Sequence, residues 1–103
     1  MRRYHLRMGI DEILGDKREE ILRIAAKHGV TSIRVFGSVA RGEAGPESDV
    51  DFLIEAGPET PPWFPGGLIA DLQDLLGRRV DVVMPDALRP FLKSTVLDEA
   101  VSF

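Results

Sequence analysis

The sequence predicts a small α/β fold of the α+β kind, in which a mixed sheet of three or four strands has helices packed against it. Two observations support this prediction. Short runs rich in β-branched residues alternate with longer runs whose apolar residues recur at helical spacing, in the order helix, strand, short helix, strand, helix, strand, helix. The chain has 103 residues, 44% of them hydrophobic, which is ordinary content for a globular domain. We therefore expect residues 1–103 to form a single domain.

The first part of the chain predicts a short helical turn and then a longer helix. The turn covers Ile10–Leu14, and Gly15 favours a break after it. Asp16 and Glu19 have the spacing of a capping box, so we expect the longer helix to begin at Asp16. Gly29 should end that helix in the left-handed conformation.

Two strands are expected next. Thr31–Phe36 is short, rich in β-branched residues and bounded by glycines. Asp49–Glu55 alternates, with Val50, Phe52 and Ile54 expected on one face and the aspartates on the other. This pattern indicates a strand with one apolar face against the core and one polar face.

The second half of the chain predicts a loop, a helix and a third strand. Gly57–Gly67 holds four prolines and reads as a loop, in which Trp63 and Phe64 could stack on a base, meet a partner protein or pin the loop to the domain. A helical stripe over Leu68–Leu76 follows, closed by a glycine. Arg79–Met84 is the third strand.

A final helix is expected at the end of the chain. Asp86 can cap this segment, Pro90 suits its first turn, and its apolar positions run as far as Val101.

The segment between the first two strands holds candidate phosphate-binding residues. Gly37 lets the backbone approach a ligand closely, and Ser38 offers a hydroxyl at the start of a short helical turn, where free N–H groups favour phosphate. Arg41 is near enough to meet a phosphate, although a surface role is equally open. Ser48 could act in the site or simply brace the turn before the second strand.

Three aspartates form a candidate metal site. Asp49 and Asp51 lie two apart on one strand, so both carboxylates point to the same face, with Cα atoms about 6 to 7 Å apart. Mg²⁺ accepts one or two carboxylates together with substrate phosphates. Asp81 lies in an otherwise apolar strand, and if that strand is next to the other, it could complete the site or take a proton from an attacking hydroxyl. The alternative is an exposed acid on an edge strand.

These residues carry a resemblance to a known family. Gly37-Ser38, ten intervening residues and Asp49-Val50-Asp51 resemble the GSx10DxD signature of the DNA polymerase β-like nucleotidyltransferase superfamily. The string GSVARGEAGPESDVDFLIE looks like its minimal nucleotidyltransferase branch, whose small proteins are commonly antitoxins paired with a HEPN-domain toxin. The LLGRRVDVV and ALRPFLKSTVLDEAV segments share the resemblance, which covers nearly the whole chain.

The resemblance implies a nucleotidyltransferase fold and a function. The family transfers AMP from ATP, with two Mg²⁺ ions, to a tyrosine of the cognate HEPN ribonuclease and silences it. Gly37, Ser38 and Arg41 would then hold phosphates. Asp49, Asp51 and Asp81 would hold metal, and Asp81 would also take the proton of the acceptor hydroxyl.

Two alternatives to this function stay open. The protein could be a non-catalytic antitoxin that masks its toxin, or a nucleotidyltransferase acting on a small molecule. The second alternative is weaker, because the sequence has no further domain for an acceptor.

Composition limits the remaining classes of function. Lys and Arg number 13 against 17 Asp and Glu, a formal net charge of −4, which disfavours broad nucleic-acid binding. The absence of cysteine excludes disulfides and Cys-ligated metals. The basic run Met1–Arg7 is not followed by a signal-type apolar core, and no apolar stretch approaches the ~20 residues of a membrane span. We expect a cytoplasmic protein without direct nucleic-acid or membrane binding.

Overall fold

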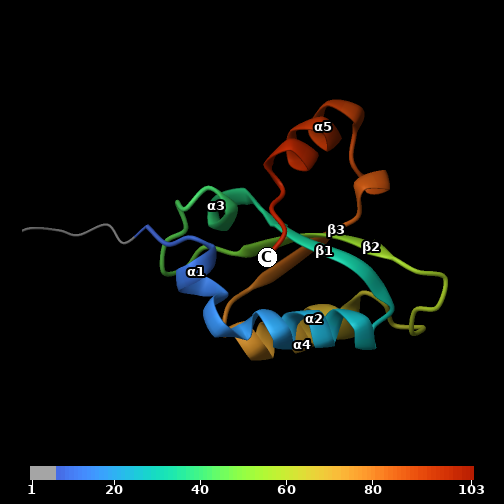
Figure 1. Ribbon diagram of the computed structural model, residues 1–103. Coiled ribbons are helices and arrows are strands. Elements are labelled where there is room, and N and C mark those ends of the chain that lie inside the picture. The colour runs from blue at the N-terminus through green and yellow to red at the C-terminus, as the bar shows by residue number, and fades with distance from the viewer. Residues whose placement is uncertain (1–6) are drawn as a thin grey trace, which may run out of the picture.

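The computed structural model describes residues 7–103, and its elements follow the predicted order (Figure 1). Most of the basic run at the start of the chain, residues 1–6, lies outside the described residues. The elements are α1 (Ile10–Ile13), the 3-10 turn η1 (Gly15–Lys17), α2 (Arg18–Lys27), β1 (Val30–Phe36), α3 (Gly37–Ala40), β2 (Val50–Ala56), α4 (Gly66–Leu76), β3 (Val80–Val83), the 3-10 turn η2 (Pro85–Ala87) and α5 (Pro90–Glu99).

The sheet has three strands in the order β1-β2-β3, which confirms the predicted small mixed sheet. β1 pairs with β2 antiparallel, and β3 pairs with β2 parallel after the α4 crossover. The central strand β2 pairs with both neighbours: Val35 of β1 lies opposite Phe52, and Phe52 lies opposite Val82 of β3. Directly opposite residues share a face, so the apolar residues of all three strands gather on one side.

The hydrophobic core lies between that apolar face and the helices α2 and α4, which lie side by side below the sheet in Figure 1. Its fully or almost fully buried members include Ile21, Ala25, Ile33, Val35, Val50, Phe52, Ile54, Leu68, Leu72 and Val80. The helix α5 lies on the other side of the sheet, and α3 lies at the end of β1, where its Val39 reaches the core. No residue of α5 is buried, so this second face is the more open one, and it carries the polar residues of β2.

The start of the longer helix differs from the prediction. Asp16 lies inside η1, and α2 begins only at Arg18 with no side-chain cap, so the expected capping box at Asp16 is wrong. A capping residue needs an extended backbone, which a residue inside a 3-10 turn does not have. The Glu12 carboxylate instead accepts the Gly9 N–H at 2.6 Å, at the start of α1. The predicted helix end is confirmed, because Gly29 has φ +81°.

The end of the chain also differs. Asp86 lies exposed within η2, and the residue at the N-cap position of α5 is Arg89, which makes no side-chain cap, so the predicted cap at Asp86 is wrong. α5 ends at Glu99, and Val101 leaves the helix to form an antiparallel bridge with Val35 of β1. The bridge satisfies backbone groups at the sheet edge, which a further helical turn would leave open.

The proline-rich loop separates its two aromatic side chains. Phe64 packs against the core, whereas the Trp63 side chain is 67% exposed. Phe64 thus pins the loop, and Trp63 faces solvent. Within residues 7–103, no helix is both long and apolar enough to cross a bilayer.

Candidate active site

The turn from β1 into α3 brings backbone against a carboxylate. Gly37, the first residue of α3, has φ +74°, a conformation that L side chains rarely adopt. A Cβ atom built there would collide with the carboxylate of Asp51. Two independent constraints therefore require glycine at position 37: the backbone conformation, and the lack of space for a side chain beside Asp51.

The short helix α3 is held firmly although it has only four residues. Val39 is fully buried in the core, and the Glu43 N–H donates to the Ser38 carbonyl at 2.8 Å. Ala44, also fully buried, exchanges two backbone hydrogen bonds with Met8. Ser38 is half-buried on this anchored turn, where the first N–H groups of the helix lack intrahelical acceptors.

The loop that leads into β2 is braced from behind. The Ser48 hydroxyl accepts the Gly45 N–H at 2.8 Å. The Arg78 guanidinium donates to the carbonyls of Gly45 at 2.9 Å and Ser48 at 3.1 Å. Ser48 thus takes the structural role left open above. Arg78 was not predicted to matter, because nothing in the sequence places it behind a loop 30 residues away.

Two of the three aspartates, Asp51 and Asp81, come from adjacent strands, and Asp49 lies in the loop directly before β2. Asp51 of β2 and Asp81 of β3 are direct partners in the parallel register, and Asp49 lies two residues before Asp51. Asp51 is half-buried, and burial, then Asp81, then Asp49 raise the pKa of its carboxyl above the ordinary value. The Asp49 carboxylate also lies 3.7 Å from the Arg79 guanidinium. The structure thus places Asp81, exposed on an edge strand, directly beside Asp51, whereas Asp49 lies before the strand and next to Arg79.

These residues fit a divalent cation. Their oxygens are the hard ligands that Mg²⁺ prefers, and the excess negative charge around Asp51 is what a cation would balance. Among residues 7–103, no group of three or more acidic or histidine side chains is placed so that it could hold a metal ion by itself. Mg²⁺ commonly takes one or two carboxylates and completes its shell with substrate phosphates and water, so an open carboxylate set suits it.

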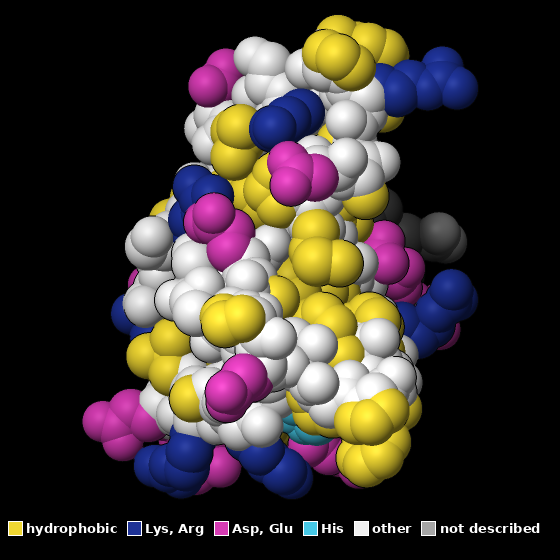
Figure 2. Space-filling model, turned by 90° about the vertical axis from the view of Figure 1, so that its right-hand side faces the viewer, with side chains coloured by type: hydrophobic (Ala, Val, Ile, Leu, Met, Phe, Trp, Pro, Cys, Tyr) yellow, Lys and Arg dark blue, Asp and Glu magenta, His cyan; other side chains and the backbone are white. Residues whose placement is uncertain are grey.

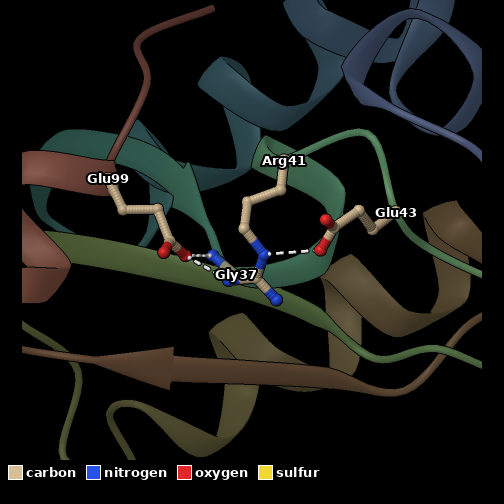
Figure 3. A network of polar contacts seen from close by, with 4 residues as sticks. All are labelled: Gly37, Arg41, Glu43 and Glu99. Atoms are coloured by element: carbon tan, nitrogen blue, oxygen red, sulfur yellow. Dashed lines mark hydrogen bonds and ion pairs between the residues drawn. The ribbon is translucent and has the colours of Figure 1, made fainter.

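Arg41 and Gly37 meet a residue that the sequence did not single out (Figure 3). One carboxylate oxygen of Glu99, the last residue of α5, accepts the Gly37 N–H at 2.5 Å and the Arg41 Nη1–H at 2.9 Å. Arg41 also donates from Nε to Glu43 at 2.9 Å. The hydrogen bonds to Glu43 and then Glu99 raise the pKa of Arg41 further above its ordinary value. In sequence, Glu99 looks like any acid on an exposed helix, so no signal marked it.

The fold and the site together define an enzyme that transfers nucleotides. An anchored Gly-Ser turn next to carboxylates on a central strand can hold phosphates and a metal around one phosphorus atom.

The comparisons with known proteins agree. The family pattern of the nucleotidyltransferase domain matches residues 18–103, and the chain belongs to this family. It is 40% identical over 93 residues to the protein adenylyltransferase MntA of Thermococcus cleftensis, covering 89% of this chain and 90% of that protein. A Methanocaldococcus jannaschii protein, provisionally named a protein adenylyltransferase, is 38% identical over 94 residues, covering 91% of this chain and 97% of that protein.

Solved structures show the same fold. A structure provisionally assigned as a minimal nucleotidyltransferase superposes with a TM-score of 0.80 at 42% identity, covering 93% of this chain and 97% of that one. A chain from the crystal structure of a toxin-antitoxin with AMP-PNP gives a TM-score of 0.69 at 21% identity, covering 82% of this chain and 69% of that one. The chain is thus an MntA-like minimal nucleotidyltransferase, as the signature predicts.

Proposed function

We propose that this chain is an antitoxin that transfers AMP from ATP to a tyrosine of a HEPN-type ribonuclease toxin and so inactivates it, with Mg²⁺ as the metal. The observation that carries the proposal is the register of Asp51 and Asp81 beside the Gly37-Ser38 turn. The relatives named protein adenylyltransferases support the choice of AMP and of a protein acceptor. Residues 1–103 would act as a single nucleotidyltransferase domain.

Each site residue has a proposed role. The backbone of Gly37 and Ser38 and the guanidinium of Arg41 hold the β- and γ-phosphates. The carboxylates of Asp49, Asp51 and Asp81 hold Mg²⁺, which supplies charge stabilisation for the entering and leaving oxygens.

The transfer is an in-line displacement at the α-phosphorus. The acceptor hydroxyl oxygen bonds to the α-phosphorus, the bond from that phosphorus to the bridging oxygen of the β-phosphate breaks, and pyrophosphate leaves. The hydroxyl proton passes to the carboxylate of Asp81, whose exposed position leaves it accessible to an acceptor from outside the chain.

An exposed apolar surface favours a protein over a small molecule as the acceptor. Figure 2 shows hydrophobic side chains gathered at the top of the molecule and continuing down its middle. Exposed large apolar residues on or beside α5 are Met84, Phe91, Leu92, Leu97 and Val101. Exposed apolar surface gathered near one helix favours protein contacts, and α5 reaches the site through Glu99.

The test uses the product of the neighbouring gene, provided that this product carries the Arg-x4–6-His motif of HEPN ribonucleases. The experiment measures how much label passes from α-labelled ATP into that product. Asp51→Asn should lower labelling roughly 100-fold or more, because it removes a charge that stabilises the transition state. Asp16→Asn, an exposed aspartate in η1, is the matched control and should label normally. Omitting Mg²⁺ should abolish labelling in every variant.

The same experiment separates the alternatives. If Asp51→Asn still neutralises the toxin stoichiometrically and mass spectrometry finds the toxin unmodified, the protein acts by masking. If label enters a small hydroxylated compound without any protein partner, the acceptor assignment is wrong. Equal labelling by Asp51→Asn and the native chain would overturn the site itself.

A further inference from the structure

The carboxylate of Glu99 occupies two of the groups that the proposed function assigns to the nucleotide's phosphates, the Gly37 N–H and the Arg41 guanidinium. One of its oxygens accepts both the Gly37 N–H and the Arg41 Nη1–H, as Figure 3 shows. A carboxylate oxygen and a phosphate oxygen make the same charge-assisted hydrogen bonds. A donor that is already bonded to an anion of the protein is not free for an anion of the substrate.

The charges around this contact make simultaneous occupancy costly. Burial raises the pKa of the Asp51 carboxyl most, followed by the charges of Asp81 and Asp49 and, least, of Glu99, so this corner of the site already holds several negative groups. A triphosphate placed on Gly37 and Arg41 with Glu99 still in place would add like charges at hydrogen-bond distance, which is strongly repulsive. One of the two anions must leave.

Glu99 is the more easily moved of the two partners in the contact. Gly37 is fixed by its position against Asp51, whereas α5 has no buried residue and lies on the open side of the sheet (Figure 1). The Glu99 side chain is 24% exposed, so solvent and ligand can reach it. Moving it aside breaks two hydrogen bonds but uncovers little apolar surface.

We infer that Glu99 is an internal competitor of ATP, a latch whose carboxylate fills the position of the β- or γ-phosphate until the nucleotide displaces it. This inference rests on the proposed function, since it concerns the same phosphate-binding groups. It adds a residue that sets nucleotide affinity without taking part in the transfer. With the latch, half-saturation of the site requires a higher ATP concentration than the phosphate-binding groups alone would require.

Binding of the non-hydrolysable analogue AMP-PNP to the full chain, measured by calorimetry with Mg²⁺, tests the latch. If the latch is closed about nine-tenths of the time, Glu99→Gln should lower the Kd of AMP-PNP about tenfold, because the competent fraction rises toward one. The Kd of AMP, which lacks the β- and γ-phosphates, should stay unchanged. Glu43→Gln is the matched control: it also removes a negative partner of Arg41 but leaves Gly37 alone. It should change the Kd of AMP-PNP less than about twofold.

Glu99→Asp distinguishes reach from charge. Aspartate keeps the negative charge but is one methylene shorter, so it cannot hold the Gly37 N–H from the same backbone position. A latch predicts that Glu99→Asp also tightens AMP-PNP binding. If Glu99→Gln tightens binding and Glu99→Asp does not, the effect is one of net charge and the latch is refuted.

Two further outcomes separate this inference from the proposed function. Weaker AMP-PNP binding in Glu99→Gln would mean that Glu99 orders the site instead of blocking it, and would overturn the latch alone. No binding of AMP-PNP by the native chain or by any variant would overturn the proposed function together with the latch. Circular dichroism melting of each variant reports whether the fold is retained.

Discussion

Gly37 joins the backbone of the β1–α3 turn to the acids of β2. Its positive φ and the Asp51 carboxylate directly beside it leave no room for a side chain. Gly42 is a natural comparison, because it has nearly the same φ, +72°, but a Cβ there would meet nothing within 4 Å. The pair therefore separates the cost of the conformation from the cost of the collision.

Substituting these two glycines should give different losses of stability. Gly42→Ala should lower the free energy of unfolding by about 1 kcal/mol, the cost of a left-handed alanine. Gly37→Ala should lose about 2 kcal/mol or more, because displacing the Asp51 carboxylate adds an overpacking cost. Urea unfolding followed by circular dichroism measures both values.

A double variant provides the check on this explanation. Asp51→Ala removes the group that the new methyl would strike, so it should restore part of the loss caused by Gly37→Ala. Equal losses for Gly37→Ala and Gly42→Ala would show that the contact with Asp51 does not matter for stability.

At the level of elements, α2 and α4 are joined by a polar contact over the core. The nearly buried His28 ring places Nε2 at 2.8 Å from the Asp71 carboxylate, which also accepts from Lys27 at 3.3 Å. These hydrogen bonds, that of His28 first, hold the pKa of Asp71 below its ordinary value. The contact ties the end of one helix to the middle of the other.

The lowered pKa gives a defined pH dependence of stability. In the folded state Asp71 keeps its charge at pH values where the unfolded chain already binds a proton. Its contribution to the free energy of unfolding is therefore complete above the unfolded pKa of about 4. That contribution is lost as the pH falls through the lower pKa of the folded state. The native chain should therefore exceed Asp71→Asn in melting temperature by a constant amount from about pH 6 to pH 5, and by less as the pH falls below about 4.

An exposed acid on the same helix is the control for this measurement. Asp74→Asn, also in α4, should show no such loss of difference below pH 4. If the difference between the native chain and Asp71→Asn is the same at pH 2 as at pH 6, the ion pair does not stabilise the fold.

The elements also show how far sequence patterns reach. Some features can be recognised from residues that are close together in the sequence: the alternation in β2, the glycine that ends α2, and the spacing between the Gly-Ser pair and the aspartates. These features predicted the sheet and the candidate site. Three features were not predictable, because each depends on a partner distant in sequence: the extended Val101 on β1, Arg78 behind the Ser48 turn and Glu99 on Gly37. The error at Asp16 has a different cause. Asp16 and Glu19 have the spacing of a capping box, but Asp16 lies in a 3-10 turn and lacks the extended backbone that a capping residue needs.

For the whole molecule, the two faces of the sheet are unequal. The face toward α2 and α4 holds most of the buried apolar residues, whereas α5 on the other side buries none of its own. The tightly packed helices α2 and α4 therefore lie on the face of the sheet away from the site, and the loosely held α5 lies on the same face as the site. A substrate can then be admitted on one side without loosening the core on the other.

Hydrogen exchange should report this inequality. The amides of β2, bonded on both sides within the sheet, should exchange slowest, near the rate set by global unfolding. The amides of α5 should exchange at least about 100-fold faster through local opening, which corresponds to about 2.7 kcal/mol of difference in opening free energy. Mass spectrometry of peptides from β2 and α5 measures both, and equal protection would contradict the description of α5 as loosely held.

The bridge between Val101 and Val35 has a consequence for the behaviour of the protein in concentrated solution. β1 is an edge strand, and an open edge offers its N–H and C=O groups to strands of other molecules. The Val35 N–H donates to the Val101 carbonyl at 3.0 Å, and the Val101 N–H donates to the Val35 carbonyl at 2.8 Å. The residues that follow α5 thereby block one docking point for a foreign strand. We therefore expect this short segment to lower the tendency of the protein to aggregate edge to edge.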